Sequence, residues 1–357
     1  MENAPMPMTR RRRLQLTLLS VGLIAVGTGV WWRPYLAESL SGLAPQGPGA
    51  GRTAASLPPP TEAQSNEAPT SVALPSAADL SRSADGRHYP LLPAEPAAIA
   101  ALLSAVETAL RDPETPAQEL PALGHQQQVI YRVLSHQEAL AAQVRAGLDP
   151  RWQSVYDRHL EARRAFLAMH RSGPKATSLP AWRIIQPPAA DTLIGHYKKA
   201  EAATGIAWEV LAAVNLVETG MGRIDGVSVA NAQGPMQFLP TTWAQAGVGK
   251  GNIRDPHDAI QAAGRYLVRR GGLQDIRKGL WGYNNSDNYG RAVLLYASLI
   301  EEDPRAYLGL YHWEIHFATA AGDLWLPVGY NQASSIPLQA FLQQSPASAP
   351  PPGSSGY

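Results

Sequence analysis

An apolar helical segment that ends in a single carboxylate constrains this chain most. Residues 207–217 are apolar except for Glu209 and Asn215, and Glu218 follows them directly. Apolar surroundings and the negative end of the helix dipole both disfavour a charged carboxylate, so we expect a raised pKa for Glu218. A carboxylic acid that stays protonated near neutral pH can act as a general acid in glycosidic bond cleavage. The alternative is a Glu that turns outward to solvent.

Ordered sequence blocks follow Glu218. They read Gly-Pro-Met-Gln-Phe-Leu-Pro-Thr-Thr-Trp at 234–243, Asp-Pro-His-Asp-Ala-Ile at 255–260 and Trp-Gly-Tyr-Asn-Asn-Ser-Asp-Asn-Tyr at 281–289. With Glu218, these blocks resemble the lytic murein transglycosylases, which have an SLT-type, lysozyme-like catalytic domain. In that family a helix ends in the catalytic Glu, a Gly-x-Met-Gln segment lines the sugar cleft, and a Tyr-Asn element closes it from the other side. The match runs from about Trp182 to about Tyr330.

The resemblance implies a role for Glu218 on peptidoglycan glycan strands. It would protonate the oxygen of the MurNAc–GlcNAc bond and then act as base on the C6 hydroxyl of MurNAc, which leaves a 1,6-anhydro end. No second carboxylate is needed, because the acetamide of the substrate can stabilise the developing charge. We expect Glu209 to lie in solvent and Asp225 to stabilise a turn. A hydrolytic muramidase and a glycan-binding module without catalysis are the alternative functions.

The same blocks supply the residues that we expect to bind substrate. These are Thr219, Ser228, Gln233, Gly234, Met236, Gln237, Tyr283, Asn284 and Tyr289. Thr219 stands where the family usually has Ser and keeps the hydroxyl, and Gln237 offers a sugar both a donor and an acceptor. Tyr283 is expected to support a pyranose ring and to hold Glu218 or the acetamide. Loop stabilisation is the alternative for Ser228 and Gln233, burial in the core is the alternative for Met236 and Tyr289, and we predict Trp281 to be a core aromatic.

Composition excludes several other classes of function. The chain has no cysteine, which excludes disulfides, thiol catalysis and cysteine-based metal sites. A formal net charge of +1 provides no strong field for binding nucleic acid. His312 and His316 are four positions apart, but the sequence shows no third ligand. We therefore expect no metal and no cofactor.

The N-terminal residues predict a membrane anchor. Arg10 to Arg13 precede an uncharged run at residues 14–32, long enough at ~1.5 Å per residue to cross a hydrocarbon core of about 30 Å. The arginines place residues 1–13 in the cytoplasm and the remaining chain outside a cell membrane crossed once. Export after cleavage of a signal peptide is the alternative.

The remaining chain divides into four predicted parts. Residues 33–92 are rich in Pro, Ala, Ser and Gly and predict a disordered linker that buries no core. A helical subdomain is predicted at 93–180, a lysozyme-like transglycosylase domain at 181–332, and a disordered tail at 333–357. The predicted fold class is mainly α, with one β-hairpin at 313–328, where apolar residues alternate.

Three amphipathic helices are expected in the helical subdomain, around Ile99, Val129 and Trp152. Their sequences show no catalytic pattern. We expect them to pack on the catalytic domain, and a docking surface for cell-wall synthesis or division proteins is the alternative.

Overall fold

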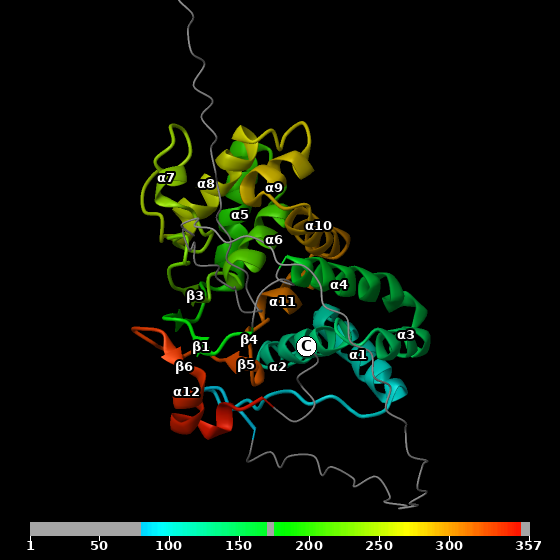
Figure 1. Cartoon of the computed structure of the whole chain (residues 1–357). Helices are drawn as coiled ribbons and strands as arrows, with labels where there is room; N and C mark the ends of the chain where they lie inside the picture. Colours follow the sequence, from blue (N-terminus) through cyan, green and yellow to red (C-terminus); the bar gives the residue numbers. More distant parts are fainter. Residues whose placement is uncertain (1–79, 170–174, 351–357) are drawn as a thin grey trace, which may run out of the picture.

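The structure is a computed structural model that describes residues 80–169 and 175–350. Figure 1 shows that this part of the chain is mainly helical, with a few short strands. The predicted cytoplasmic segment 1–13, the predicted anchor 14–32 and most of the predicted linker lie outside the described residues. Among the residues that are described, no helix combines the length and the apolar character that a membrane crossing requires.

Helices occupy most of residues 96–168. They are α1 (Pro96–Arg111), α2 (Leu120–Leu134), α3 (Glu138–Gly147) and α4 (Pro150–Ala168). We predicted three helices here and missed α3, which buries only Ala141 and Val144 and so has a weak apolar period. Helix α4 begins at Pro150, and the side chain of Asp149 caps it by accepting a hydrogen bond from the backbone N–H of Arg151.

A second set of helices contains the residues predicted to be catalytic. It consists of α5 (Ala190–Thr204), α6 (Trp208–Thr219), α7 (Pro240–Trp243), α8 (Pro256–Arg269), α9 (Ile276–Asn284), α10 (Asp287–Glu302) and α11 (Ala306–Tyr311). Every residue of α6 from Val210 to Thr219 is buried, because α5, α8 and α10 all pack against this helix. Helix α6 ends at Gly220, whose φ of 60° is left-handed and suits glycine.

One hydrophobic core joins the two sets of helices. It extends from Ile99 in α1, through Leu211 in α6, to Trp313 after α11. Helix α4 lies along α10, and α2 packs against α11 (Figure 1). The predicted helical subdomain therefore shares its core with the predicted catalytic domain.

The strands form three short antiparallel pairs within the described residues. They are β1 (Ser178–Leu179) with β6 (Ile336–Pro337), β2 (Arg183–Ile184) with β3 (Ile224–Asp225), and β4 (Ile315–Thr319) with β5 (Gly322–Leu326). The last pair confirms the predicted β-hairpin, with Ile315 opposite Leu326 and Thr319 opposite Gly322. Alternation gives the hairpin two buried faces, because Trp325 packs toward α2 while Phe317 and Leu324 enter a separate apolar cluster.

Two predicted boundaries are wrong. Tyr89 is only 4% exposed and packs against Val129 and Trp325, so the folded part includes residues 80–92 of the predicted linker. The predicted disordered tail contains β6, α12 (Leu338–Gln344) and a 3₁₀ turn (Pro346–Ser348). Phe341 of α12 is buried beside Tyr330. In both segments a few apolar residues find distant partners that local composition does not reveal.

Candidate active site

Glu218 lies in the last turn of α6 and is 2% exposed. Burial raises the pKa of this carboxyl from an ordinary value of 4.5 to about 8, and a hydrogen bond from Tyr289 opposes the shift. The Tyr289 hydroxyl donates to Oε1 of Glu218 at 2.8 Å. The raised pKa agrees with the expectation from the sequence, and the alternative of an outward-facing Glu does not hold. Glu218 is thus a protonated acid at neutral pH, held in one orientation.

Two tyrosines stack beside Glu218. The rings of Tyr283 and Tyr289 are nearly parallel, with centroids 6.2 Å apart and an angle of 5° between planes. The Tyr283 hydroxyl donates to the backbone oxygen of Met236 at 2.7 Å. Of the two predicted partners of Tyr283, Glu218 or the acetamide of the substrate, Glu218 is therefore wrong, because Tyr289 has that contact. The reason is a chain reversal at Asn285, whose φ of 53° ends α9 and allows α10 to bring Tyr289 back beside Tyr283.

Residues 233–238 form a tight loop next to α6. Gln233 and Phe238 exchange both backbone hydrogen bonds, at 2.9 and 3.0 Å, which closes the loop. Gly234 has a φ of 72°, and a Cβ there would lie 1.9 Å from the backbone oxygen of Ile253, so only glycine fits. Met236 is fully buried in the core, as its alternative interpretation has it.

Gln237 provides an acceptor inside this loop. Its backbone is left-handed, with a φ of 48°, and its side chain is 7% exposed. Nε2 donates to the backbone oxygen of Gly234 at 2.9 Å, while Oε1 is buried without a hydrogen-bond partner among the described residues. A buried acceptor of this kind favours a ligand that donates a hydrogen bond.

Thr219 braces the loop against the catalytic helix. Its side chain has no exposed surface. The hydroxyl donates to the backbone oxygen of Pro235 at 2.6 Å and accepts from the N–H of Gly222 at 3.0 Å. Asn215, one turn earlier, also donates to the Pro235 oxygen, at 2.8 Å. The structure therefore gives Thr219 an internal contact in place of the predicted substrate contact, and it adds Asn215, which the sequence analysis missed.

The other predicted site residues separate into buried and loop positions. Asn284 is 5% exposed at the end of α9. Ser228 accepts the N–H of Ala232 at 2.8 Å, and Gln233 bonds to Asn231 and to Arg254. Loop stabilisation, the alternative for Ser228 and Gln233, therefore describes their contacts.

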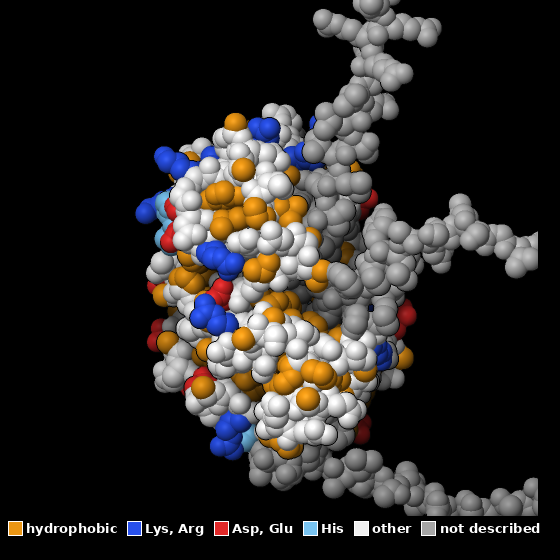
Figure 2. Space-filling model, turned by 60° about the vertical axis from the view of Figure 1, so that its left-hand side comes forward, with side chains coloured by type: hydrophobic (Ala, Val, Ile, Leu, Met, Phe, Trp, Pro, Cys, Tyr) orange, Lys and Arg blue, Asp and Glu red, His pale blue; other side chains and the backbone are white. Residues whose placement is uncertain are grey.

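The surface on the β2–β3 side is mixed in character. Figure 2 shows hydrophobic side chains in separate groups among Lys and Arg, with few acidic side chains. Asp225 of β3 forms ion pairs with Arg183 and Arg254. The carboxylate of Asp225 is thus engaged by two arginine side chains, whereas the carboxyl of Glu218 is bonded to Tyr289.

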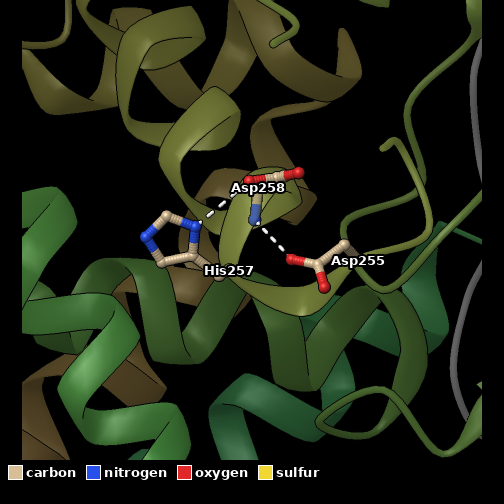
Figure 3. Close-up of side chains that lie close together, drawn as sticks. All are labelled: Asp255, His257 and Asp258. Atoms are coloured by element: carbon tan, nitrogen blue, oxygen red, sulfur yellow. Dashed lines mark hydrogen bonds and ion pairs between the residues drawn. The ribbon is translucent and has the colours of Figure 1, made fainter. Parts of the chain in front are cut away.

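Asp255, His257 and Asp258 are the acidic and histidine residues grouped closely enough to suggest a metal site in the described part of the chain. Figure 3 shows the carboxylate of Asp255 directed at the backbone nitrogen of Asp258, at 3.0 Å. Asp258 in turn accepts the N–H of Asn252 at 2.9 Å and contacts His257 Nδ1 at 3.1 Å. These contacts cap the start of α8, so we assign the group a capping role.

His312 and His316, the two histidines four positions apart, have different surroundings. His316 is fully buried, and its Nε2 lies 3.0 Å from Nε2 of His125 on α2. His312 ends α11 and lies next to Tyr311. His316 of β4 thus contacts a histidine of α2, and this contact joins the hairpin to the N-terminal helices.

Comparison with known protein families gives a match within the helical region that contains Glu218. A family model described as "Transglycosylase SLT domain" matches residues 196–294. Searches of curated proteins and of solved structures returned no match. The matched residues include Glu218, the loop at 233–238 and both stacked tyrosines. The chain therefore contains a transglycosylase SLT domain that begins within α5 and ends within α10.

Proposed function

We propose that this protein is a peptidoglycan lytic transglycosylase that cleaves the β-1,4 bond between MurNAc and GlcNAc and leaves a 1,6-anhydro-MurNAc end. The SLT domain supports a transglycosylase-type action on peptidoglycan. The observation that carries the finer proposal is the state of Glu218, a buried acid with a pKa raised to about 8 inside that domain. The lysozyme-like fold that we propose for this domain rests on the same family match.

In the first step, Glu218 acts as a general acid. Its proton goes to the glycosidic oxygen as the bond from that oxygen to C1 of MurNAc breaks, and GlcNAc leaves as the alcohol. Positive charge develops at C1, and the acetamide of the substrate can stabilise it, so a second carboxylate is not required. The ion pairs of Asp225 agree with this single-carboxylate scheme.

In the second step, Glu218 acts as a base. The carboxylate accepts the proton of the C6 hydroxyl while O6 bonds to C1, which closes the anhydro ring and restores the protonated acid. The hydrogen bond from Tyr289 stabilises the carboxylate between the two steps. Gln237, with its unmatched Oε1, is suited to orient a sugar N–H or O–H. Water takes no part in these two steps, whereas a hydrolytic muramidase would use water in place of O6.

Substitution of Glu218 tests the catalytic role. Glu218→Gln keeps the size of the side chain but removes the titrating group, so we expect at least roughly a hundredfold slower cleavage of purified peptidoglycan. Glu209→Gln is the matched control, because it is the same substitution in the first turn of the same helix. Equal cleavage by the wild type and Glu218→Gln would refute the proposal. Glycan binding by the wild type without any cleavage would favour the glycan-binding alternative.

We also propose that residues 14–32 anchor the protein in the cell membrane with the SLT domain outside the cytoplasm. The proposal rests on Arg10 to Arg13 and on the uncharged run that follows them. Protease added to intact spheroplasts should then remove the folded part. Protection from the protease would refute this orientation, and release of the protein into the medium would favour signal cleavage. The outer faces of α1–α4 are where we would expect cell-wall synthesis or division proteins to dock.

A further inference from the structure

An exposed tryptophan lies on the side of α9 that faces away from Glu218. We predicted Trp281 as a core aromatic, but it is 46% exposed. Tyr283 is two positions later on the same helix, and residues two apart in a helix point about 200° apart. Because Tyr283 stacks on Tyr289 beside Glu218, Trp281 is directed to the opposite face. Helix α10 repeats this division, with Tyr289 toward Glu218 and Leu294 on the other side.

Trp281 borders a hollow of about 480 Å³ between α9, α10 and α4. Leu294 and Leu295 supply its apolar lining, and Arg277, Ser286 and Glu161 supply polar groups. The helices that form it are neighbours in Figure 1, where α9 and α4 lie on either side of α10. A volume in this range holds small-molecule ligands in other proteins, where pockets measure about 300–1,000 Å³.

A second hollow continues the first along α4. It has a volume of about 610 Å³ and is lined mainly by α4, with Asn288 and Arg291 from α10. Glu161 and Arg291 line both hollows, and their side chains form an ion pair at 2.6 Å. The two hollows thus adjoin at this pair and form one elongated depression, which we call the α4–α10 groove.

Charges in the α4–α10 groove balance. Its arginines are Arg164, Arg277 and Arg291, and its acidic residues are Asp157, Glu161 and Asp287. An equal number of both signs gives no net attraction to a charged ligand. It does offer many donors and acceptors to an uncharged polar ligand.

We propose that the α4–α10 groove is a second glycan-binding site, which takes a strand of β-1,4-linked N-acetylated sugars outside the active site. The apolar C–H face of a β-linked pyranose can pack on the exposed indole of Trp281 and remove both surfaces from water. Its hydroxyls and acetamide can bond to the charged and polar groups around the ring. The elongated shape suits a linear polymer, and the groove would keep an insoluble strand close to the protein between cleavage events. This inference rests on the proposed action on peptidoglycan.

Binding of chitohexaose, a soluble β-1,4-linked GlcNAc oligomer, tests the groove. The titration uses the full chain with Glu218→Gln, so that cleavage cannot interfere. We expect two binding sites by calorimetry, and the added Trp281→Ala should remove one of them or weaken it about fivefold to tenfold. Trp281→Phe keeps an aromatic ring and should retain most of the affinity. Leu273→Ala is the control, because Leu273 is 51% exposed and lines neither hollow.

Several outcomes would overturn the proposal. One is a single chitohexaose site whose affinity is the same in the Trp281→Ala variant, provided that this variant has the same thermal midpoint as the Glu218→Gln protein. Another is competition by stem peptide without sugars at the Trp281 site, which would make the groove a peptide site. Cleavage activity is a separate readout: if Glu218→Gln cleaved peptidoglycan at the full rate, the proposed function would fail while loss of binding by Trp281→Ala would still support the groove.

Discussion

The hydroxyl of Tyr289 donates a hydrogen bond to Oε1 of Glu218 at 2.8 Å. Burial favours the protonated acid, and this hydrogen bond favours the carboxylate. Burial has the larger effect, since the pKa lies at about 8. The pair therefore suits a residue that must first donate a proton and then accept one.

Removal of the Tyr289 hydroxyl should slow catalysis. Tyr289→Phe deletes one hydrogen bond to a charged group, worth about 1.5–3 kcal/mol, so we expect kcat to fall roughly 10- to 100-fold. Tyr283→Phe is the matched control, because its hydroxyl bonds to the backbone of Met236 and not to Glu218. Steady-state assays on purified peptidoglycan compare the two. A larger loss in Tyr283→Phe than in Tyr289→Phe would contradict the assignment.

Activity should decrease as pH rises through about 8. The first step needs protonated Glu218, and burial keeps it protonated up to its raised pKa of about 8. In Tyr289→Phe this alkaline limb should move to higher pH, because the lost hydrogen bond had stabilised the charged form. The measurement is kcat/KM against pH, at constant ionic strength. A limb near the pKa of free Glu, in either protein, would show that Glu218 is not held in the protonated form.

The same pKa predicts how stability depends on pH. The folded-state pKa of Glu218 lies above its unfolded value of 4.5, so the folded protein binds more protons between those two values. The free energy of unfolding should therefore fall as pH rises from about 4.5 to about 8 through this group. Glu218→Gln should remove this contribution and be the more stable protein at pH 8.5, by an amount on the order of a few kcal/mol. Chemical denaturation at pH 5 and pH 8.5 measures both differences.

Thr219 should contribute to stability through its hydroxyl. Thr219→Val keeps the shape of a buried side chain but leaves the Pro235 oxygen with one bond fewer and the Gly222 N–H without its partner. We expect a loss of about 1–3 kcal/mol in the free energy of unfolding. Thr219→Ser restores a hydroxyl and should recover most of it. Equal stability of all three proteins in urea would show that the brace is unimportant.

Local features of the sequence could predict a large part of this account. The apolar run of α6 and the carboxylate at its end predicted the buried acid. Alternating apolar residues predicted the β4–β5 hairpin. Each of these patterns lies within one element, where spacing along the chain determines which side chains share a face.

Contacts between distant elements could not be predicted in the same way. Tyr283 and Tyr289 are both aromatic and both near the Tyr-Asn block, and only the reversal at Asn285 decides which hydroxyl reaches Glu218. The exposure of Trp281 depends on which side of α9 is covered by α10. Tyr89 and Phe341 are single aromatic residues in segments of low complexity, and they are buried by residues more than thirty positions away or in other elements.

The start of the folded part gives a further prediction. A chain that begins at residue 93 loses Tyr89, which is 4% exposed, and Arg87, which pairs with Glu314 at 2.9 Å. Loss of a buried aromatic costs about 3–5 kcal/mol, and the unpaired buried Glu314 adds to this. A chain that begins at residue 80 keeps both contacts and should have the higher thermal midpoint. Equal midpoints would restore the sequence-based boundary at residue 92.

Mass spectrometry of the products released from purified peptidoglycan tests the central claim most directly, because anhydro and reducing ends differ by one water. The wild-type protein should release muropeptides with 1,6-anhydro-MurNAc ends, and Glu218→Gln should release almost none. Products with reducing MurNAc ends from the wild type would contradict the non-hydrolytic route, and undiminished anhydro products from Glu218→Gln would contradict the role of Glu218.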